Sequence, residues 1–139
     1  AAHSRRVPCE HDEIARFAKS RNPINHMTVC YRKSAVLAAG NYQHAPLYED
    51  YDLWVRMLLN GCRFANLSEV LVYARAGDEM YRRRGGWAYA KNELAMQWRF
   101  YRAGFLSTAQ WAKNVLLRLP VRLLPNGVRQ WVYRVLLRK

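Results

Sequence analysis

The distribution of apolar positions along the chain predicts helices that alternate with short strands. Residues 49–60, EDYDLWVRMLLN, place charged and apolar side chains at helical spacing, whereas three short apolar runs predict buried strands. These runs are residues 26–31, 62–67 and 70–75. Such an alternation is typical of an α/β fold.

Capping residues mark the ends of the predicted helices. Gly40 and Gly61 suit the left-handed conformation that commonly follows a helix, so each is expected to end the helix before it. Ser107, followed three residues later by Gln110, has the spacing of a capping box. Further helices are predicted over residues 10–20, 32–40, 87–102 and 128–138.

The composition indicates a folded chain with room for one domain or part of one. Hydrophobic residues make up 51% of the 139 residues and aromatic residues 13%, which argues against intrinsic disorder. The widely spaced Cys9, Cys30 and Cys62 form no metal-binding pattern and are expected to be reduced, mostly buried thiols. The chain shows neither a signal peptide nor an apolar run long enough to cross a membrane. A cytoplasmic location is therefore expected.

Charge is distributed unevenly along this basic chain, whose formal net charge is +13. No acidic residue follows Glu93, whereas nine basic residues do. In residues 107–139 these basic residues alternate with Leu, Val and Trp, and Pro120 is expected to interrupt the helical pattern. Helices of this kind are typical of a membrane interface, where Trp111 and Trp131 would serve as anchors. The alternative is an ordinary amphipathic helix packed on the domain.

Three acids crowd into the otherwise apolar stretch LYEDYDLWVR. Glu49 and Asp52 share a helical stripe with Arg56, which a solvated face with an i, i+4 ion pair would explain. Asp50 instead projects with Trp54 towards the side that should be packed. Asp50 is therefore either a helix cap tied to backbone N–H groups or a general base at the edge of an apolar wall.

Three segments, in order, resemble the C-terminal half of bacterial family 2 glycosyltransferases that build exopolysaccharide or lipopolysaccharide. They are RNPINHMTVCYRKSAVLAAGNYQ, LYEDYDLWVRMLLNG and CRFANLSEVLVYAR. The resemblance runs from about Val7 to Leu106 and implies a GT-A fold, with residues 1–106 as the acceptor-side half of the domain. It also implies a nucleotide-sugar donor, a saccharide or polyprenyl-linked acceptor, and inversion at the anomeric carbon. Residues 107–139 follow as the basic amphipathic helical tail, whose pattern predicts a peripheral location on the inner face of the cell membrane.

The same resemblance implies Mg²⁺ or Mn²⁺ on the donor diphosphate, held by an Asp-x-Asp motif in the N-terminal half of such enzymes. The nearest match here, within EDYD, belongs to the later motif. The donor-binding half is therefore expected to be absent from this chain, and a separate polypeptide would have to supply it. A non-catalytic remnant is the alternative.

The resemblance also implies roles for single residues. Asp50 corresponds to the catalytic base, and Glu49 would orient the loop or the acceptor. Trp54 would offer a flat face to a sugar ring, or else pack in the core. Three polar residues before the first predicted strand suit hydrogen bonds to acceptor hydroxyls: Asn22, Asn25 and His26. A histidine such as His26 is more often structural than a ligand.

The segment GDEMYRRRGG resembles the flexible lid of these enzymes. Its three consecutive arginines, Arg82, Arg83 and Arg84, could clamp the donor diphosphate, because guanidinium groups match phosphate oxygens. A solvated basic turn is the alternative. The charge also permits nucleic-acid binding, but no recognised binding motif occurs and the arginines alternate with aliphatic residues, so nucleic acid is an unlikely partner.

Overall fold

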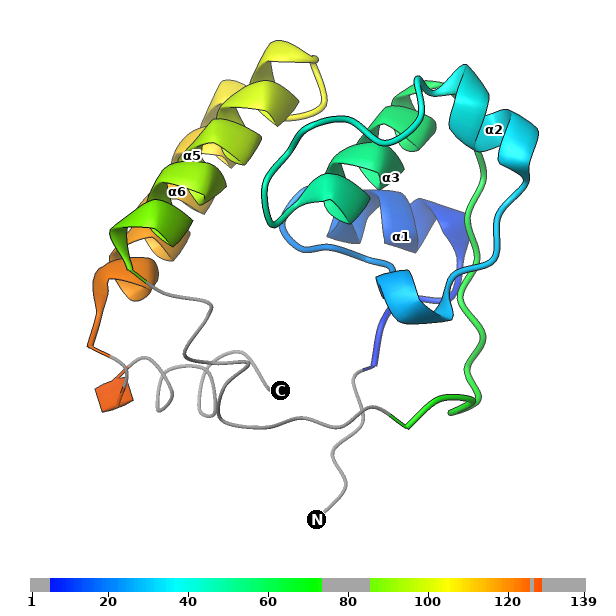
Figure 1. Cartoon of the computed structure of the whole chain (residues 1–139), viewed down its shortest axis with the longest axis horizontal. Coiled ribbons are helices and arrows are strands. Elements are labelled where there is room, and N and C mark those ends of the chain that lie inside the picture. The colour runs from blue at the N-terminus through cyan, green and yellow to red at the C-terminus, as the bar shows by residue number, and fades with distance from the viewer. Residues whose placement is uncertain (1–5, 74–85, 126, 129–139) are drawn as a thin grey trace. The chain divides into compact units, whose positions relative to one another are not determined.

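The computed structural model describes residues 6–73, 86–125 and 127–128 (Figure 1). These residues belong to two compact units, Ala1–Tyr73 and Ala74–Lys139. The first unit contains α1 (His11–Phe17), the 3₁₀ turn η1 (His26–Thr28), α2 (Lys33–Ala38) and α3 (Glu49–Leu59). The second unit contains α5 (Trp87–Arg102) and α6 (Thr108–Leu123). The proposed division of function at residue 106 stays a prediction.

Helix α3 supplies the core of the first unit. Leu53 and Trp54 are completely buried and pack with Ile24, Val36 and Met57. Burying one such side chain is worth about 1.5–3 kcal/mol, so this face of α3 holds the unit together. A hydrogen bond joins α3 to the chain just after α1, because the Tyr51 hydroxyl donates to the Ala18 carbonyl at 2.6 Å.

The predicted ion pair between Asp52 and Arg56 is present, but Asp52 does not belong to a solvated face. The Nε of Arg56 donates to Asp52 Oδ2 at 2.9 Å, and Asp52 is only 1% exposed. The Nη1 of Arg56 also donates to the carbonyl of Ala39, which follows α2. Arg56 thus satisfies a carbonyl left open at the end of α2 and shields the Asp52 carboxylate from water.

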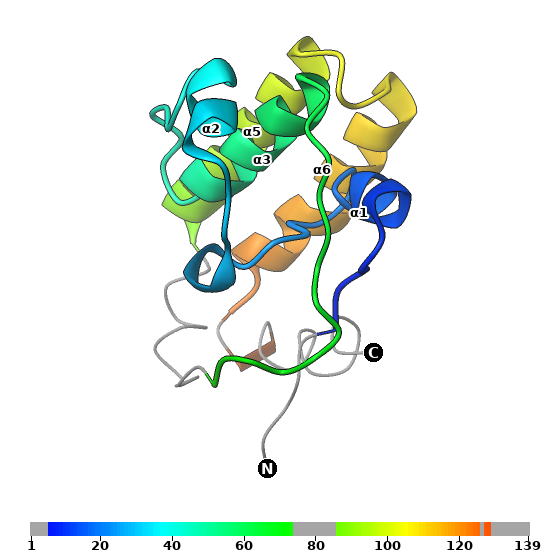
Figure 2. The same cartoon turned by 90° about the vertical axis from the view of Figure 1, so that its right-hand side faces the viewer.

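No β-strand occurs in the described ranges, so the predicted α/β class is not confirmed for this part of the chain. Residues 26–28 form η1, and Figure 2 shows residues 62–73 as an extended segment without a strand arrow. Along that segment the Asn66 N–H donates to the Cys9 carbonyl at 3.0 Å. A strand needs a neighbour that pairs with its successive N–H and C=O groups, and the described residues do not form such a ladder.

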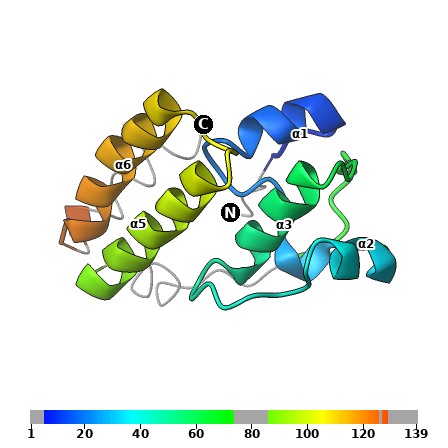
Figure 3. The ribbon, with the colours of Figure 1, turned by 90° about the horizontal axis from the view of Figure 1, so that it is seen from above.

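The described part of the second unit is a hairpin of two helices that lie side by side (Figure 3). Helix α5 spans the predicted residues 87–102. The predicted capping box is confirmed, since Ser107 Oγ accepts from the Gln110 N–H at 3.2 Å and Gln110 Oε1 accepts from the Ser107 N–H at 3.0 Å. Pro120 does not interrupt α6, which continues to Leu123. Proline leaves the carbonyl four residues earlier unpaired, and Leu116 at that position is exposed to water.

A row of polar contacts lies inside the hairpin. The fully buried Glu93 accepts hydrogen bonds from Arg118 Nη1 at 2.6 Å and from Arg122 Nη2 at 2.9 Å. One helical turn along α5, Gln97 accepts from Asn114 Nδ2 at 3.1 Å. Arg118 and Arg122 belong to the predicted basic tail. In the structure they form ion pairs with Glu93, the last acid of the chain.

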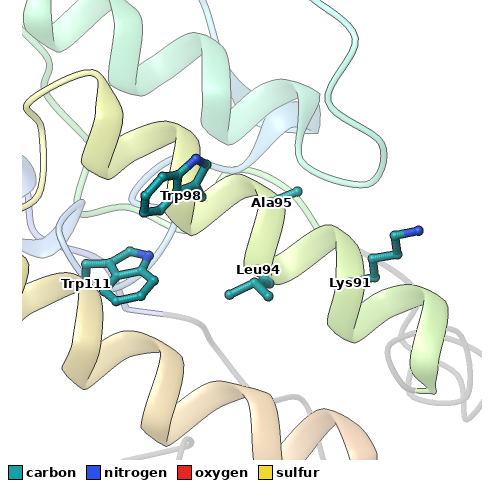
Figure 4. A pocket seen from close by; sticks show the side chains of 5 residues that line it. All are labelled: Lys91, Leu94, Ala95, Trp98 and Trp111. Atoms are coloured by element: carbon teal, nitrogen blue, oxygen red, sulfur yellow. The ribbon is translucent and has the colours of Figure 1, made fainter.

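Apolar side chains remain on the outside of this hairpin. Leu116 and Leu117 on α6 are 73% and 62% exposed. A hollow of about 420 Å³ is lined by Lys91, Leu94, Ala95, Trp98 and Trp111 (Figure 4). None of the helices within the described ranges is both long and apolar enough to cross a membrane. The helix predicted at 128–138 lies, after residue 128, outside the described residues.

The cysteines differ from the prediction of mostly buried thiols. All three are free, but Cys30 is exposed and Cys9 and Cys62 are only half-buried. Cys62 packs against the edge of the first unit's core. Their spacing could not reveal this exposure, because it depends on which segments cover each residue.

Candidate functional site

Asp50 lies in the first turn of α3 and is half-buried. Its Oδ1 accepts a hydrogen bond from the backbone N–H of Tyr51 at 2.7 Å. The first N–H groups of a helix have no partner within the helix, and the helix dipole favours an anion there. The helix-cap interpretation of Asp50 is therefore supported for one of its two oxygens.

Asn22 holds the other oxygen of Asp50. Its side-chain Nδ2 donates to Asp50 Oδ2 at 2.9 Å, across 28 positions of sequence. Asn22 Oδ1 in turn accepts from the Ile24 N–H at 3.3 Å, which fixes the amide within its own loop. Each carboxylate oxygen can accept two hydrogen bonds, so this arrangement orients Asp50 without exhausting its capacity.

An aromatic cluster surrounds the start of α3. The rings of Tyr31 and His26 lie 6.0 Å and 6.3 Å from Trp54, centroid to centroid. His26 also contacts Tyr42, because its Nε2 and the Tyr42 hydroxyl are 2.9 Å apart. Tyr31 and Tyr42 are 43% and 37% exposed, so parts of both rings face outward.

Tyr42 lies close enough to the acids to be influenced by their charge. Burial raises the pKa of Tyr42 to about 12, together with a hydrogen bond to Tyr31 and the charges of Asp50 and Glu49. A nearby negative charge disfavours the phenolate. The loop that carries Tyr42 and the first turn of α3 therefore belong to one electrostatic environment.

The predicted acceptor residues fall into two groups. Asn22 and His26 join the cluster around Asp50. Asn25 is exposed, and its backbone carbonyl accepts from the Thr28 N–H at 3.1 Å, so its described contact shapes η1. Glu49 is exposed at the first position of α3.

The interpretation of Trp54 as a sugar platform is not supported by its position. Its relative exposure is 0%, because His26, Tyr31 and Phe64 cover the indole. A ring without an accessible face cannot stack on a substrate. Trp54 instead lies beneath the partly exposed Tyr31 and the exposed His26 and packs against both rings.

Sequence reasoning missed Tyr31 and Tyr42 as site residues. Each is an isolated tyrosine in an irregular segment, without a motif or a period that marks it. One signal for Tyr42 was available in Gly40, the glycine after α2. Gly40 at φ +86° and Asn41 at φ +57° turn the chain just before Tyr42, so a turn could have been expected there.

Two further predictions concern the donor and its metal. Arg82, Arg83 and Arg84 lie outside the described residues. Within the described ranges, no three His, Cys, Asp or Glu side chains gather in a way that could hold a metal ion. The side chains around Asp50 therefore do not fit Mg²⁺ or Mn²⁺, and no chemical step is assigned to a metal held there.

Comparison with known proteins shows what the chain is similar to. The chain is 38% identical over 97% of its length to an Escherichia coli protein named UDP-Gal:alpha-D-GlcNAc-diphosphoundecaprenol beta-1,3-galactosyltransferase. It is 39% identical over 93% of its length to an amylovoran biosynthesis glycosyltransferase of Erwinia amylovora. An uncharacterized glycosyltransferase of Haemophilus influenzae is 42% identical over 97% of the chain.

These homologues are glycosyltransferases. Those with a named pathway act in bacterial polysaccharide synthesis. The chain spans about half the length of these curated relatives, namely 49%, 48% and 50%. No protein-family model matches the chain, and no solved structure matches it.

Proposed function

We propose that this chain is the acceptor-side portion of an inverting glycosyltransferase that acts in cell-surface polysaccharide synthesis. The similarity to glycosyltransferases along nearly the whole chain supports the reaction class. The oriented carboxylate of Asp50, in the first turn of α3, carries the assignment of a catalytic role. The family 2 assignment and the GT-A fold of the complete enzyme belong to the same proposal.

In this mechanism Asp50 acts as the general base. An acceptor hydroxyl attacks the anomeric carbon of the donor sugar, and Asp50 takes its proton as the new carbon–oxygen bond forms. The bond from the anomeric carbon to the diphosphate breaks on the opposite side, so the configuration inverts and a nucleoside diphosphate leaves. Asn22 keeps the base oriented, which limits the entropy lost on reaching the reactive geometry.

The donor side of the reaction requires groups beyond the described residues. A nucleotide-sugar and its Mg²⁺ or Mn²⁺ would be bound by a donor-binding half that carries an Asp-x-Asp motif. Arg82, Arg83 and Arg84 would neutralise the departing diphosphate, as the resemblance implies. The acceptor would be a saccharide or a polyprenyl-linked saccharide.

The proposal is tested by joining the chain to the donor-binding half of the Escherichia coli relative and measuring sugar transfer from UDP-galactose. We expect Asp50→Asn to lower the rate about 10²–10⁴-fold, because the amide cannot take a proton. Asp12→Asn is the matched control, since Asp12 is an exposed acid in the first turn of α1. Circular dichroism would check that both variants fold.

Each outcome has a definite meaning for the proposal. Near-normal transfer by Asp50→Asn would remove this residue from the mechanism. No transfer by the unaltered hybrid, with both halves folded, would favour the non-catalytic alternative. Loss of transfer in Asp50→Asn alone supports the general base.

We also propose that the second unit brings the protein to an anionic membrane surface. The exposed Leu116 and Leu117 on α6 and the half-exposed Trp98 on α5 support this, because such residues partition into membrane interfaces. Lys91 and Lys113 are exposed and available to anionic headgroups. The ion pairs of Arg118 and Arg122 with Glu93 reduce the positive charge available, so apolar contact has the larger part.

Vesicle flotation tests the membrane proposal. We expect the chain to bind vesicles that contain phosphatidylglycerol, and Leu116→Gln with Leu117→Gln to weaken that binding at least fivefold. Leu59→Gln, an exposed leucine at the end of α3, is the control. Equal binding by all variants would contradict a role for α6. Salt-sensitive binding of oligonucleotides without vesicle binding would favour the nucleic-acid alternative.

A further inference from the structure

The residues around Asp50 include exposed aromatic side chains that have no role in the proposed reaction. A pyranose ring has an apolar face of C–H groups and a rim of hydroxyls. Aromatic side chains contribute large apolar contact area with few rotatable bonds, and their faces carry partial negative charge that attracts C–H groups. A sugar subsite is therefore expected to combine exposed rings with polar groups at their edge.

We propose that Tyr31 and Tyr42 form this subsite and receive the apolar face of the acceptor sugar beside Asp50. The inference rests on the proposed glycosyltransferase function and names where the acceptor lies. It replaces Trp54, which is buried, with two tyrosines that are 43% and 37% exposed.

Packing from below holds the two rings in place. The Tyr31 ring lies 6.0 Å from Trp54, at an interplanar angle of 51°. Tyr42 is held by the contact of its hydroxyl with His26 Nε2 at 2.9 Å, and the His26 ring lies edge-on to Trp54. Rings that are already fixed lose little conformational entropy when a ligand binds.

Polar groups lie at the edge of this aromatic surface. Asp50 lies one helical turn before Trp54 on the same face of α3, and the Trp54 ring contacts both Tyr31 and His26. Asn22 is bonded directly to Asp50. A sugar whose apolar face covers Tyr42 would therefore place its hydroxyls close to Asp50, the proposed base.

The inference gives His26 a positioning role. His26 touches both Tyr42 and Trp54, so it connects the floor of the cluster to the exposed ring. Its ring is tilted by 35° to that of Tyr42, with centroids 5.6 Å apart. We therefore expect His26→Ala to weaken sugar binding by loosening Tyr42, and His26→Gln to restore part of it through a hydrogen bond to the Tyr42 hydroxyl.

Saturation-transfer NMR on the full chain tests the subsite without any transfer reaction. The probes are the methyl glycosides of glucose, galactose and N-acetylglucosamine, each at millimolar concentration. We expect transfer to the ring C–H protons of at least one glycoside, and at least fivefold weaker binding in Tyr42→Ala and in Tyr31→Ala. Tyr42→Phe keeps the ring but loses the contact of its hydroxyl with His26, so it should bind about as well as His26→Ala and better than Tyr42→Ala.

Tyr73→Ala is the matched control, because Tyr73 is an exposed tyrosine of the same unit. Thermal unfolding would confirm that each variant keeps its fold, and Tyr42→Phe keeps the test decisive if an alanine variant does not. Binding that is unchanged in the Tyr31 and Tyr42 variants would overturn the inference, as would binding of uridine diphosphate and of no glycoside.

Failure of this inference differs from failure of the proposed function. If the hybrid enzyme transfers sugar and needs Asp50, but the tyrosine variants bind and react normally, the subsite alone is wrong. If the tyrosines bind glycosides but Asp50→Asn transfers normally, the subsite stands and the general base is wrong.

Discussion

At the scale of single residues, the contact between Asn22 and Asp50 decides how the candidate base is held. One oxygen of Asp50 is tied to the helix backbone and the other to an amide from a distant loop. A helix cap needs only the first of these contacts. The second contact joins two segments that both belong to the glycosyltransferase resemblance, which is what a positioned functional group requires.

The first prediction concerns the amide of this contact. Asn22→Asp should lower the free energy of unfolding by about 1–3 kcal/mol at pH 7, because it replaces a hydrogen bond with two adjacent negative charges. Urea denaturation at pH 7 measures this. Asn25→Asp, on the same loop but exposed, should change little.

The second prediction concerns the Tyr42 phenol. Its pKa of about 12 lies above the ordinary value near 10, so the fold favours the neutral phenol. The resulting stabilisation is complete below pH 10 and is lost as the pH rises from about 10 to 12. In a carbon-13 NMR titration, Glu49→Gln with Asp50→Asn should lower the pKa of Tyr42. Glu69→Gln, an exposed acid elsewhere in the unit, should leave it unchanged.

At the scale of elements, the α5–α6 hairpin depends on a buried acid. Glu93 is fully buried and paired with Arg118 and Arg122, which are 23% and 11% exposed. A buried ion pair adds little over an apolar pair of the same shape, but removal of one partner leaves the other charge uncompensated. These contacts therefore fix the register of the two helices more than they add to stability.

The third prediction follows from this cluster. Glu93→Ala should destabilise the second unit by about 3–5 kcal/mol, because two partly buried guanidinium groups lose their partner. Glu69→Ala is the control, since Glu69 is an exposed acid. Urea denaturation followed by the fluorescence of the hairpin tryptophans measures the change. A loss below about 1 kcal/mol would contradict the role assigned to this cluster.

The fourth prediction concerns the start of α6. Ser107→Ala should cost about 0.5–2 kcal/mol, because it removes the acceptor for the Gln110 N–H and breaks the capping box. Ser68→Ala removes an exposed serine in a loop and should cost much less. Thermal unfolding of both variants compares them directly. Equal melting temperatures would show that the cap does not limit stability.

Prediction from sequence succeeded where the signal is local. The bounds of α5, the capping box of Ser107 and the positive φ angles of Gly40 and Gly61 all depend on neighbouring residues, and all were recovered. The predicted strands failed, because a strand exists only if another segment pairs with it. The described residues of this chain offer no such partner to residues 62–73.

The candidate site was predicted in its residues but not in its contacts. The resemblance named Asp50, Asn22 and His26, yet their grouping depends on how a loop folds back over α3. Helical periodicity placed Trp54 on the packed side but could not say whether it would be covered. Tyr31, His26 and Phe64 cover it, and no local pattern indicates that.

At the scale of the whole molecule, an extended apolar segment lies uncovered. Leu67, Val70, Leu71, Val72 and Tyr73 are all exposed, with Leu71 at 69%. These residue types favour strands, and the described residues do not give the segment a strand partner. An unpaired apolar segment of this kind is a template for pairing with another chain.

The fifth prediction is that this segment drives self-association. Sedimentation velocity should detect oligomers that increase with protein concentration, because a second copy can pair with the backbone of residues 67–73 and cover its leucine and valine side chains. Leu71→Lys should shift the distribution to monomer, since a charge on an exposed strand opposes such pairing. Leu59→Lys introduces the same charge at the exposed end of α3 and should leave the oligomers in place. If both lysine variants dissociate the oligomers equally, net charge rather than this segment controls association.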